Sequence, residues 1–363
     1  MSAPRVLLAG AVLAQGSGGV RRHNQELLPR AARLLEERGG RLAVLVAKDG
    51  LTLSLPDSIE RIASNVPSGP PLVRALREGH ALGRALAAAR AREEPFDLVH
   101  SAHLPAPRGL PVPYTLTLHD LRTLELAHTP FSRRFFARSV IGAAVAAARA
   151  VITVSETVRA TLCARFQPRQ VFVVPNAGDH LPVLPRAKAP GAALLHVGHL
   201  EPRKNLGLLL EALAADPTLP DLELAGAAKA GEEAALRARA AELGVAARVR
   251  LLGAVPDEAL PGLYARCAAV VIPSRLEGFG IGVLEAQRAR APLAIAAAGA
   301  LPEVAGEGVP RFAPDDVEAC ARAIRAALAL APATLDEHAR RAERYRWETS
   351  AAALVAAWSA ALE

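Results

Sequence analysis

The sequence predicts an α/β protein built from two doubly wound parallel sheets in series. Short apolar runs alternate with long stretches rich in alanine, leucine and arginine, and this alternation is typical of βαβ units. A proline-rich stretch, Leu181–Pro190, interrupts the pattern, which then begins again. The length of 363 residues, 51% of them hydrophobic, is enough for two domains whose cores need no disulfides.

The apolar runs in the first part of the chain are predicted to be strands. They are Arg5–Ala9, Leu42–Val46, Asp97–His100, Tyr114–Leu118, Ala150–Val154 and Val171–Val174. The stretches between them are long enough for helices, for example Gly19–Arg38 and Pro71–Arg92. Because Met1–Gly10 has no long apolar region and no clear cleavage site, we interpret it as a first buried strand rather than a signal peptide.

The second part of the chain repeats this pattern and ends in a helix. Its predicted strands are Ala193–Val197, Leu222–Ala225, Val249–Leu252, Ala269–Ile272 and Leu293–Ala296, and Trp347–Glu363 is predicted to be one amphipathic helix. We therefore expect domains at residues 1–182 and 183–346, followed by the helix at 347–363. Two doubly wound domains bind ligands in a cleft beside the carboxyl ends of their strands.

Composition excludes several classes of protein. It does not fit a disordered, collagen-like or disulfide-stabilised chain. The cysteines Cys163, Cys267 and Cys320 are odd in number and far apart, so they fit no zinc site and indicate a reducing compartment. No apolar run approaches the ~18 residues of a membrane span, since the run Val140–Ala148 stops at Arg149. We expect a cytoplasmic protein.

The formal net charge of +7 has a simple interpretation as a solvated, arginine-rich surface. One patch is the better candidate for a contact with a membrane surface, because basic and aromatic residues interleave in it. It consists of Arg133, Arg134, Phe135, Phe136 and Arg138, beside Phe131. No helix-turn-helix, zinc-finger or RNP pattern is found, so we expect no nucleic-acid partner.

Two segments of the first domain carry candidate functional groups. Gly16–Val20 (GSGGV) precedes a helix, where glycines let the backbone approach a ligand and the helix N-terminus favours anions, although a flexible turn is the alternative. His119 follows a strand and can act as an acid, a base or a hydrogen-bond donor, or it caps the next helix. For His100 and His103 we favour a purely structural role.

Two segments of the second domain carry charged residues beside predicted turns. Arg203 and Lys204 stand where a helix begins, which suits a diphosphate, although a solvated pair is the alternative. Glu277 falls in the glycine-rich loop of Pro273–Glu285, and Glu285 lies about two turns into the next helix. A carboxylate in so apolar a stretch costs free energy unless it is paired or bound, and a carboxylate can accept both hydroxyls of a ribose.

No D-x-D pair and no His/Cys/Asp cluster with metal-ligand spacing occurs in the sequence. We therefore expect no metal ion and no other cofactor. Cationic side chains and helix N-termini would then have to stabilise any departing diphosphate.

Together these segments resemble the retaining family 4 glycosyltransferases of GT-B fold. The spacing of Glu277 and Glu285 is similar to the E-x7-E signature of that family, and Val197–Asn205 (VGHLEPRKN) resembles a second block. Further similar blocks are Gly16–Val20, Thr117–Leu121, Ala150–Leu162, Val173–Ala177 and Ala300–Val304, which follow in the family's order.

The resemblance implies that the second domain binds a nucleoside-diphosphate sugar as the donor substrate. The implied donor contacts are Arg203 and Lys204 on the diphosphate, Glu285 on the ribose, Glu277 on the sugar hydroxyls, the backbone amides of Phe279, Gly280 and Ile281 around sugar and phosphate, and Val255 beside the base. Transfer would retain the anomeric configuration by front-face attack, and the leaving phosphate would take the proton of the acceptor.

The first domain, by the same resemblance, would bind the acceptor. His119 would contact the transferred sugar near the reacting carbon, and Gly19 would approach the phosphate. The terminal helix around Trp347 would cross back to the first domain. The sequence departs from the family pattern at His199, where many members have arginine, so that Arg203 and Lys204 would carry the phosphate contacts. It also has Ala291 where glycine is common before the proline, and NAG at residues 176–178 where NG is usual.

Donor and acceptor remain open at the level of the sequence. The sugar can be mannose, rhamnose, glucose or an N-acetylhexosamine, and the HDL and PRKN segments favour GDP-mannose. The acceptor can be a surface polysaccharide, a lipid-linked glycan or a small metabolite. A nucleotide-sugar epimerase or phosphorylase of the same fold, and a non-catalytic nucleotide-sugar-binding protein, are the alternative functions. The arginine–phenylalanine patch is also the candidate for a peripheral contact with the inner face of the membrane.

Overall fold

The computed structural model describes residues 3–14, 18–51, 53–69, 71–107, 109–126, 129–187 and 191–363. The chain divides into two compact units, one of Met1–Asn176 with Trp347–Glu363 and one of Ala177–Arg346. The boundary lies six residues before the expected one, because Gly178 packs against Leu284 and His180 lies beside Glu285 in the second unit. Each unit is described by itself below.

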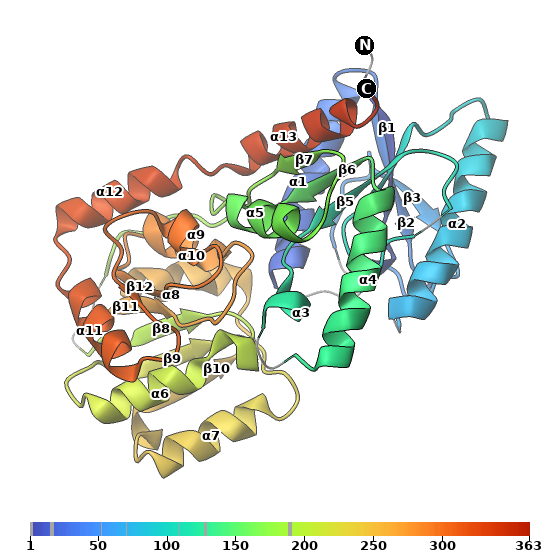
Figure 1. Ribbon diagram of the computed structural model, residues 1–363. Coiled ribbons are helices and arrows are strands. Elements are labelled where there is room, and N and C mark those ends of the chain that lie inside the picture. Colours follow the sequence, from blue (N-terminus) through green and yellow to red (C-terminus); the bar gives the residue numbers. More distant parts are fainter. Residues whose placement is uncertain are drawn as a thin grey trace. The chain divides into compact units, whose positions relative to one another are not determined.

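The first unit contains, within the described residues, a seven-stranded parallel sheet in the order β3-β2-β1-β4-β5-β6-β7 (Figure 1). The strands are β1 (Arg5–Ala9), β2 (Arg41–Val46), β3 (Glu60–Ala63), β4 (Leu98–Ser101), β5 (Tyr114–Leu118), β6 (Ala150–Thr153) and β7 (Val171–Val173). Sequence analysis missed β3, because this edge strand is only half-buried and its sequence ERIA forms no apolar run.

Helices cover both faces of this sheet. They are α1 (Gly19–Glu36), α2 (Pro71–Ala91), α3 (Arg122–Glu125), α4 (Phe131–Ala147), α5 (Glu156–Arg165) and α13 (Trp347–Ala360), and a short 3-10 helix, η1, spans Ala11–Ala14. α2, α4 and α5 contribute to one hydrophobic core with the side chains of Leu7 and Leu116. α13, the predicted terminal helix, packs along α1 and buries Trp347 and Trp358 completely.

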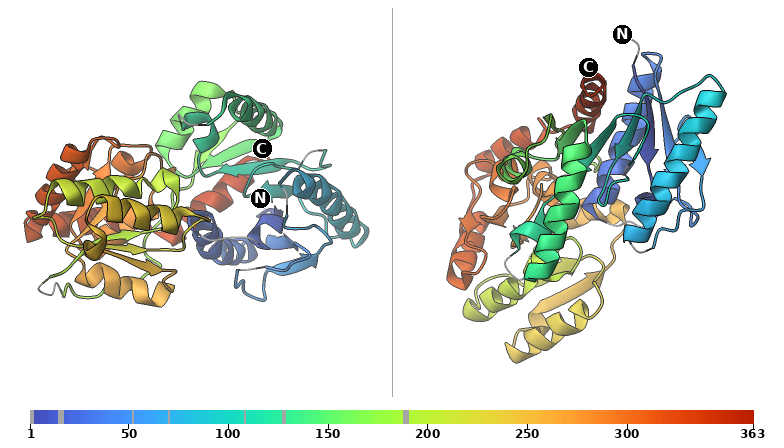
Figure 2. Two further views of the ribbon diagram at one scale, coloured as in Figure 1. Left: turned by 90° about the horizontal axis from the view of Figure 1, so that it is seen from below. Right: turned by 45° about the vertical axis from the view of Figure 1, so that its right-hand side comes forward.

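The second unit contains a six-stranded parallel sheet, again within the described residues, in the order β10-β9-β8-β11-β12-β13. The strands are β8 (Leu194–Val197), β9 (Leu222–Ala225), β10 (Val249–Gly253), β11 (Ala269–Ile272), β12 (Leu293–Ala296) and β13 (Arg311–Phe312). The longer helices are α6 (Leu206–Ala215), α7 (Glu232–Glu242), α8 (Leu260–Arg266), α9 (Ile281–Arg288), α10 (Leu301–Ala305), α11 (Val317–Leu328) and α12 (Pro332–Ala342). The views in Figure 2 show the two units from other directions.

Strand order reverses once in each sheet, and this positions the candidate site. In the first unit the chain moves from β1 to β2 and β3, and then returns to the other side of β1 with β4. In the second unit the same reversal lies between β8 and β11. Loops that leave the carboxyl ends of strands at such a reversal diverge and leave room for a ligand. None of the helices that the structure describes is long and apolar enough to cross a membrane.

Candidate active site

Glu277 lies at the reversal of the second sheet, in the loop between β11 and α9. The residue is 8% exposed, and its carboxylate accepts hydrogen bonds on both oxygens. Lys204 Nζ donates to Oε1 at 2.6 Å, Ser274 Oγ donates to Oε1 at 2.7 Å, and Arg203 Nη1 donates to Oε2 at 2.8 Å. The predicted cations and the predicted carboxylate, more than 70 residues apart in sequence, are therefore one cluster.

The charges of this cluster fix the ionisation of Glu277. Burial by itself raises the pKa of the carboxyl group, but the positive charges of Lys204 and Arg203 outweigh burial and lower the pKa from 4.5 to about 2. Arg203 Nε also lies 2.8 Å from Glu201 Oε1, and Lys229 pairs with the same carboxylate. Three cations thus face two carboxylates, so the cluster carries a net positive charge that suits an anionic ligand.

His196 lies beneath the same cluster, at the end of β8, and sequence analysis assigned it no role. It is completely buried, and its Nδ1 donates to the Val271 carbonyl at 3.0 Å. Burial, followed by the charge of Lys204, lowers the pKa of His196 to about 4, so the ring is neutral at pH 7. A buried histidine inside an apolar strand gives no periodic signal, which is why the sequence alone did not single it out.

The loop after Glu277 supplies backbone donors at the start of α9. Gly280 has φ +98°, in the left-handed region that favours glycine, and its carbonyl accepts the first amide bond of the helix from Val283. Among the described residues, the amides of Phe279, Gly280 and Ile281 have no hydrogen-bond acceptor. Amides at a helix N-terminus form a binding site for phosphate or hydroxyl oxygens.

Glu285 projects from α9 and is held by two side chains of the second unit. Tyr264 Oη donates to Glu285 Oε2 at 2.5 Å, and His180 Nε2 lies 3.0 Å from Oε1. Burial, followed by the charge of Glu285, raises the pKa of Tyr264 well above its usual range, so the phenol remains a donor. A ligand hydroxyl would share the carboxylate with these two groups.

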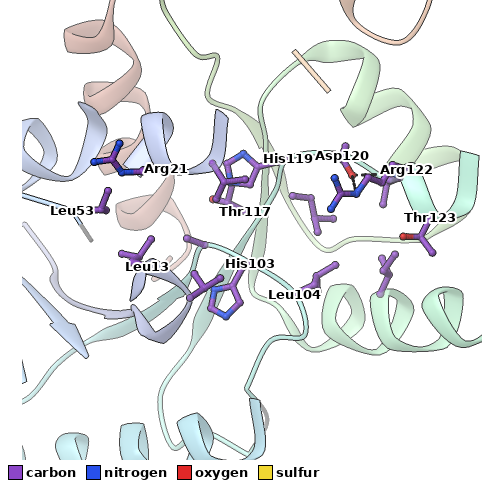
Figure 3. Close-up of a pocket in the computed structure, with 16 residues that line it drawn as sticks. Leu13, Arg21, Leu53, His103, Leu104, Thr117, His119, Asp120, Arg122 and Thr123 are labelled. Atoms are coloured by element: carbon purple, nitrogen blue, oxygen red, sulfur yellow. Dashed lines mark hydrogen bonds and ion pairs between the residues drawn. The ribbon is translucent and has the colours of Figure 1, made fainter. Parts of the chain in front are cut away.

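In the first unit, a pocket of about 400 Å³ opens at the carboxyl edge of the sheet (Figure 3). Its walls come from residues that follow β1, β4 and β5 and from the start of α1. The lining residues are Val12, Leu13, Val20, Arg21, Leu53, Ala102, His103, Leu104, Thr117, Leu118, His119, Asp120, Leu121, Arg122, Thr123 and Ile141. Apolar walls with two arginines suit a ligand that has an apolar part and an anionic or hydroxyl-bearing part.

His119 lines this pocket and contacts a second histidine. The rings of His119 and His23 meet edge to face with centroids 4.7 Å apart, and His23 Nδ1 donates to Asn176 Oδ1 at 2.7 Å. Burial lowers the pKa of His119 to about 4 and that of His23 to about 3. Both rings are therefore neutral near pH 7, so His119 can offer a ligand a hydrogen bond but no positive charge.

Two histidines at the end of β4, His100 within the strand and His103 after it, differ from each other. His100 is buried, its Nδ1 bonds Thr115 Oγ1 at 2.9 Å, and its ring packs on Trp358, which agrees with the structural role expected for it. His103 instead lines the pocket, and its Nε2 lies 3.5 Å from Oε2 of the fully buried Glu78.

The remaining predicted residues carry few contacts. Gly19 is exposed at the first position of α1 with open space around it, whereas Gly16 and Ser17 lie outside the described residues. Val255 follows β10 and is half-buried, and His199 Nδ1 lies 3.3 Å from the Ala227 carbonyl. Within the described parts of the chain, no three His, Cys, Asp or Glu side chains are grouped so as to hold a metal ion.

Two family models match the chain, one for each unit. The model described as glycosyltransferase family 4 matches residues 17–180, and the model described as glycosyl transferases group 1 matches residues 186–346. The chain belongs to the family 4 glycosyltransferases.

Relatives of this glycosyltransferase agree with that assignment. A D-inositol 3-phosphate glycosyltransferase of Geodermatophilus obscurus is 36% identical over 54% of this chain and 48% of its own length. O-antigen chain mannosyltransferase B of Escherichia coli is 31% identical over 56% of this chain and 58% of its own length. The chain thus spans about half the length of the curated relatives that it matches.

Solved structures show that the glycosyltransferase has the GT-B fold. Sucrose-phosphate synthase from Thermosynechococcus elongatus superposes with a TM-score of 0.78, at 20% identity and over 98% of both chains. HepE of Anabaena, solved with UDP and glucose, has a TM-score of 0.69 at 20% identity, over 99% of this chain and all of its own. The predicted two doubly wound sheets are therefore confirmed.

The glycosyltransferase also has residues in contact with the candidate site residues that sequence analysis missed. They are His23, Glu78, His196, Ser274 and Tyr264. Ser274 lies within the segment Pro273–Glu285 that sequence analysis singled out, three residues before Glu277, and its hydroxyl could have been proposed as a partner of that carboxylate. His23 and Glu78 lie on helices, where only the tertiary packing shows that a polar side chain faces inward.

Proposed function

We propose that the protein transfers a hexose from a nucleoside-diphosphate sugar to an acceptor hydroxyl, with retention of configuration and without a metal ion. The cluster of Glu277 with Arg203 and Lys204, beside unpartnered amides, carries this proposal. The second unit binds the donor and the pocket of the first unit binds the acceptor.

The reaction breaks the bond between the anomeric carbon and the diphosphate, so negative charge grows on the leaving group. Arg203 and Lys204 are held in place by Glu277 before any ligand binds, which lowers the cost of organising them in the transition state. The amides of Phe279, Gly280 and Ile281 donate to the same oxygens. The departing phosphate oxygen takes the proton of the acceptor hydroxyl, so no separate base is needed.

The sugar and the nucleotide are recognised by two carboxylates that already accept hydrogen bonds within the protein, and by one neutral histidine. Glu277 accepts hydrogen bonds from sugar hydroxyls, and Glu285 accepts those of the ribose while it remains bonded to Tyr264. Neutral His119 binds a hydroxyl of the transferred sugar near the reacting carbon. Mannose from GDP-mannose is the favoured group, as the PRKN segment and the mannosyltransferase among the relatives suggest.

Release of nucleoside diphosphate from a panel of UDP-, GDP-, dTDP- and ADP-sugars in EDTA tests the proposal. We expect slow release from one donor, unchanged by EDTA and lost in Glu277→Gln. The control Glu233→Gln changes an exposed carboxylate of α7 and should keep full activity. Release that needs a divalent cation would contradict metal independence, and unchanged release in Glu277→Gln would contradict the site.

A further inference from the structure

We infer that the first unit docks on an anionic membrane surface through the exposed sides of α2 and α4, with the acceptor pocket at the same edge of the sheet. The two exposed helix sides, called the docking face below, are defined by Val73, Leu76, Arg77 and Arg84 on α2 and by Phe131, Arg133, Phe135, Phe136 and Arg138 on α4. The docking does not depend on the proposed transferase activity.

Apolar side chains are unusually exposed on both helices. Phe131 is 82%, Phe135 64% and Phe136 54% exposed in the first two turns of α4, and Leu76 is 71% exposed on α2. Val73, Leu76 and Arg77 follow one another at helical spacing on α2, so they share one side of that helix. Large apolar side chains gathered in this way on a surface mark a place where something else covers them.

The charged side chains that define the docking face are all arginines. α4 contains three arginines and no acidic residue, and α2 contains four arginines and one acidic residue, Glu78, which is completely buried. Among the described residues, Arg77, Arg84 and Arg133 form no ion pair, whereas Arg41 and Arg61 of the same unit pair with carboxylates. Unpaired cations beside exposed apolar groups complement an anionic lipid surface.

The topology of the first unit places the starts of α2 and α4 at the same edge of the sheet as the pocket. α2 precedes β4 and α4 precedes β6, so both helices begin at the carboxyl edge of the parallel sheet. Both contribute buried residues to the same core, which places them on one face of the sheet (Figure 1). The pocket with His119 opens at that edge, and Ile141 of α4 lines it.

The side-chain types favour a bilayer over a nucleic acid. Aliphatic Leu76 and Val73 cannot stack on bases as aromatic rings do, but beside the exposed phenylalanines they add apolar surface that can be buried at the boundary between headgroups and acyl chains. The consequence for the acceptor, that it is an amphipathic molecule presented at the membrane, rests on the proposed function.

Flotation of the full chain with vesicles tests the docking directly. The vesicles are phosphatidylcholine alone or with about 30% phosphatidylglycerol, and binding is read as a partition coefficient. We expect the protein to float with the anionic vesicles and to remain behind with the neutral ones. The readout uses no activity, so its failure leaves the proposed function untouched.

Matched variants locate the contact. Arg77→Ser/Arg133→Ser should lower the partition coefficient about 30-fold, or about 2 kcal/mol at 1.4 kcal/mol per tenfold. Arg38→Ser/Arg169→Ser removes the same charge from exposed, unpaired arginines that precede β2 and β7 at the opposite edge, and should change it less than about threefold. Phe131→Ser/Phe135→Ser should lower it at least about tenfold.

Several results would overturn the inference. Equal binding to neutral and anionic vesicles would contradict the attraction between the arginines and anionic lipids. Equal losses of binding in the two double-arginine variants would contradict the location of the contact on the docking face. Binding of duplex DNA with the same arginine and phenylalanine dependence, without vesicle binding, would make the face a nucleic-acid surface instead. All variants should keep the melting temperature of the wild type, which shows that lost binding is not lost folding.

Discussion

Replacement of Glu277 by glutamine should remove a pH-dependent part of the stability of the second unit. The side chain keeps its size and its hydrogen bond with Ser274, but it loses the charge that pairs with Lys204 and Arg203. The carboxylate is almost fully buried, so solvent screens these pairs little.

The magnitude follows from the lowered pKa of Glu277. A carboxyl group with a pKa of 4.5 in the unfolded chain and about 2 in the folded protein contributes roughly 3 kcal/mol at pH 7. Because the folded pKa is the lower one, this contribution is complete above the unfolded pKa and is lost as the pH falls from about 4.5 towards 2. Between pH 7 and pH 3 the advantage of the wild type over Glu277→Gln should shrink by about 2 kcal/mol.

Urea unfolding of both proteins between pH 7 and pH 3 measures this difference. Glu348→Gln is the matched control, since its carboxylate pairs with Arg33 on the surface of the first unit and should contribute less than about 1 kcal/mol at any pH. A stability difference for Glu277→Gln that is the same at pH 7 and pH 3 would refute the argument that the two cations hold this carboxylate ionised.

Three further predictions concern single residues. Gly280→Ala should destabilise the second unit by about 1–3 kcal/mol in thermal unfolding, because its Cβ would lie 2.7 Å from Leu301 Cδ2 and φ is positive; Gly262→Ala, with open space and an ordinary φ, is the control. Tyr264→Phe should raise the KM for the donor several-fold with little change in kcat, since it removes a donor to Glu285 and leaves the diphosphate cluster intact; an unchanged KM would argue against a ribose contact. Nitrogen-15 NMR of His119 should show a neutral ring from pH 8 down to about pH 5, because burial lowers its pKa to about 4; titration near 6.5 would show that the ring is solvated.

Sequence patterns predicted the parts of the fold that depend on continuous burial. Strands such as β1 and β11 are buried on both faces, so they form apolar runs that stand out from the helices. The half-buried edge strand β3 and the two-residue β13 lack such runs and were not predicted. The division into compact units falls six residues before the expected boundary, because the contacts of Gly178 and His180 depend on packing and not on composition.

Candidate site residues were predictable where chemistry and local spacing coincide. Arg203 and Lys204 stand out because two adjacent cations at the start of a helix suit a diphosphate. Glu277 stands out because a carboxylate in an apolar stretch costs free energy unless it is paired or bound. The neutral state of His119 was not predictable, since it depends on burial beside His23, which lies almost a hundred residues away in the sequence. Nor could the sequence show that Tyr264 and His180 share the carboxylate of Glu285.

Calorimetric titration with nucleoside diphosphates tests the central claim, that the cluster of Arg203, Lys204 and Glu277 holds the donor diphosphate. GDP, UDP, ADP and dTDP are titrated into the wild type, into Lys204→Met and into the control Arg237→Met, which removes an exposed cation that pairs with Glu233 on α7, outside the cluster. We predict that one nucleotide binds the wild type, that Lys204→Met weakens this binding about 10- to 100-fold, and that Arg237→Met changes it less than about threefold. Equal affinity in the wild type and Lys204→Met would contradict the assignment of the diphosphate to this cluster.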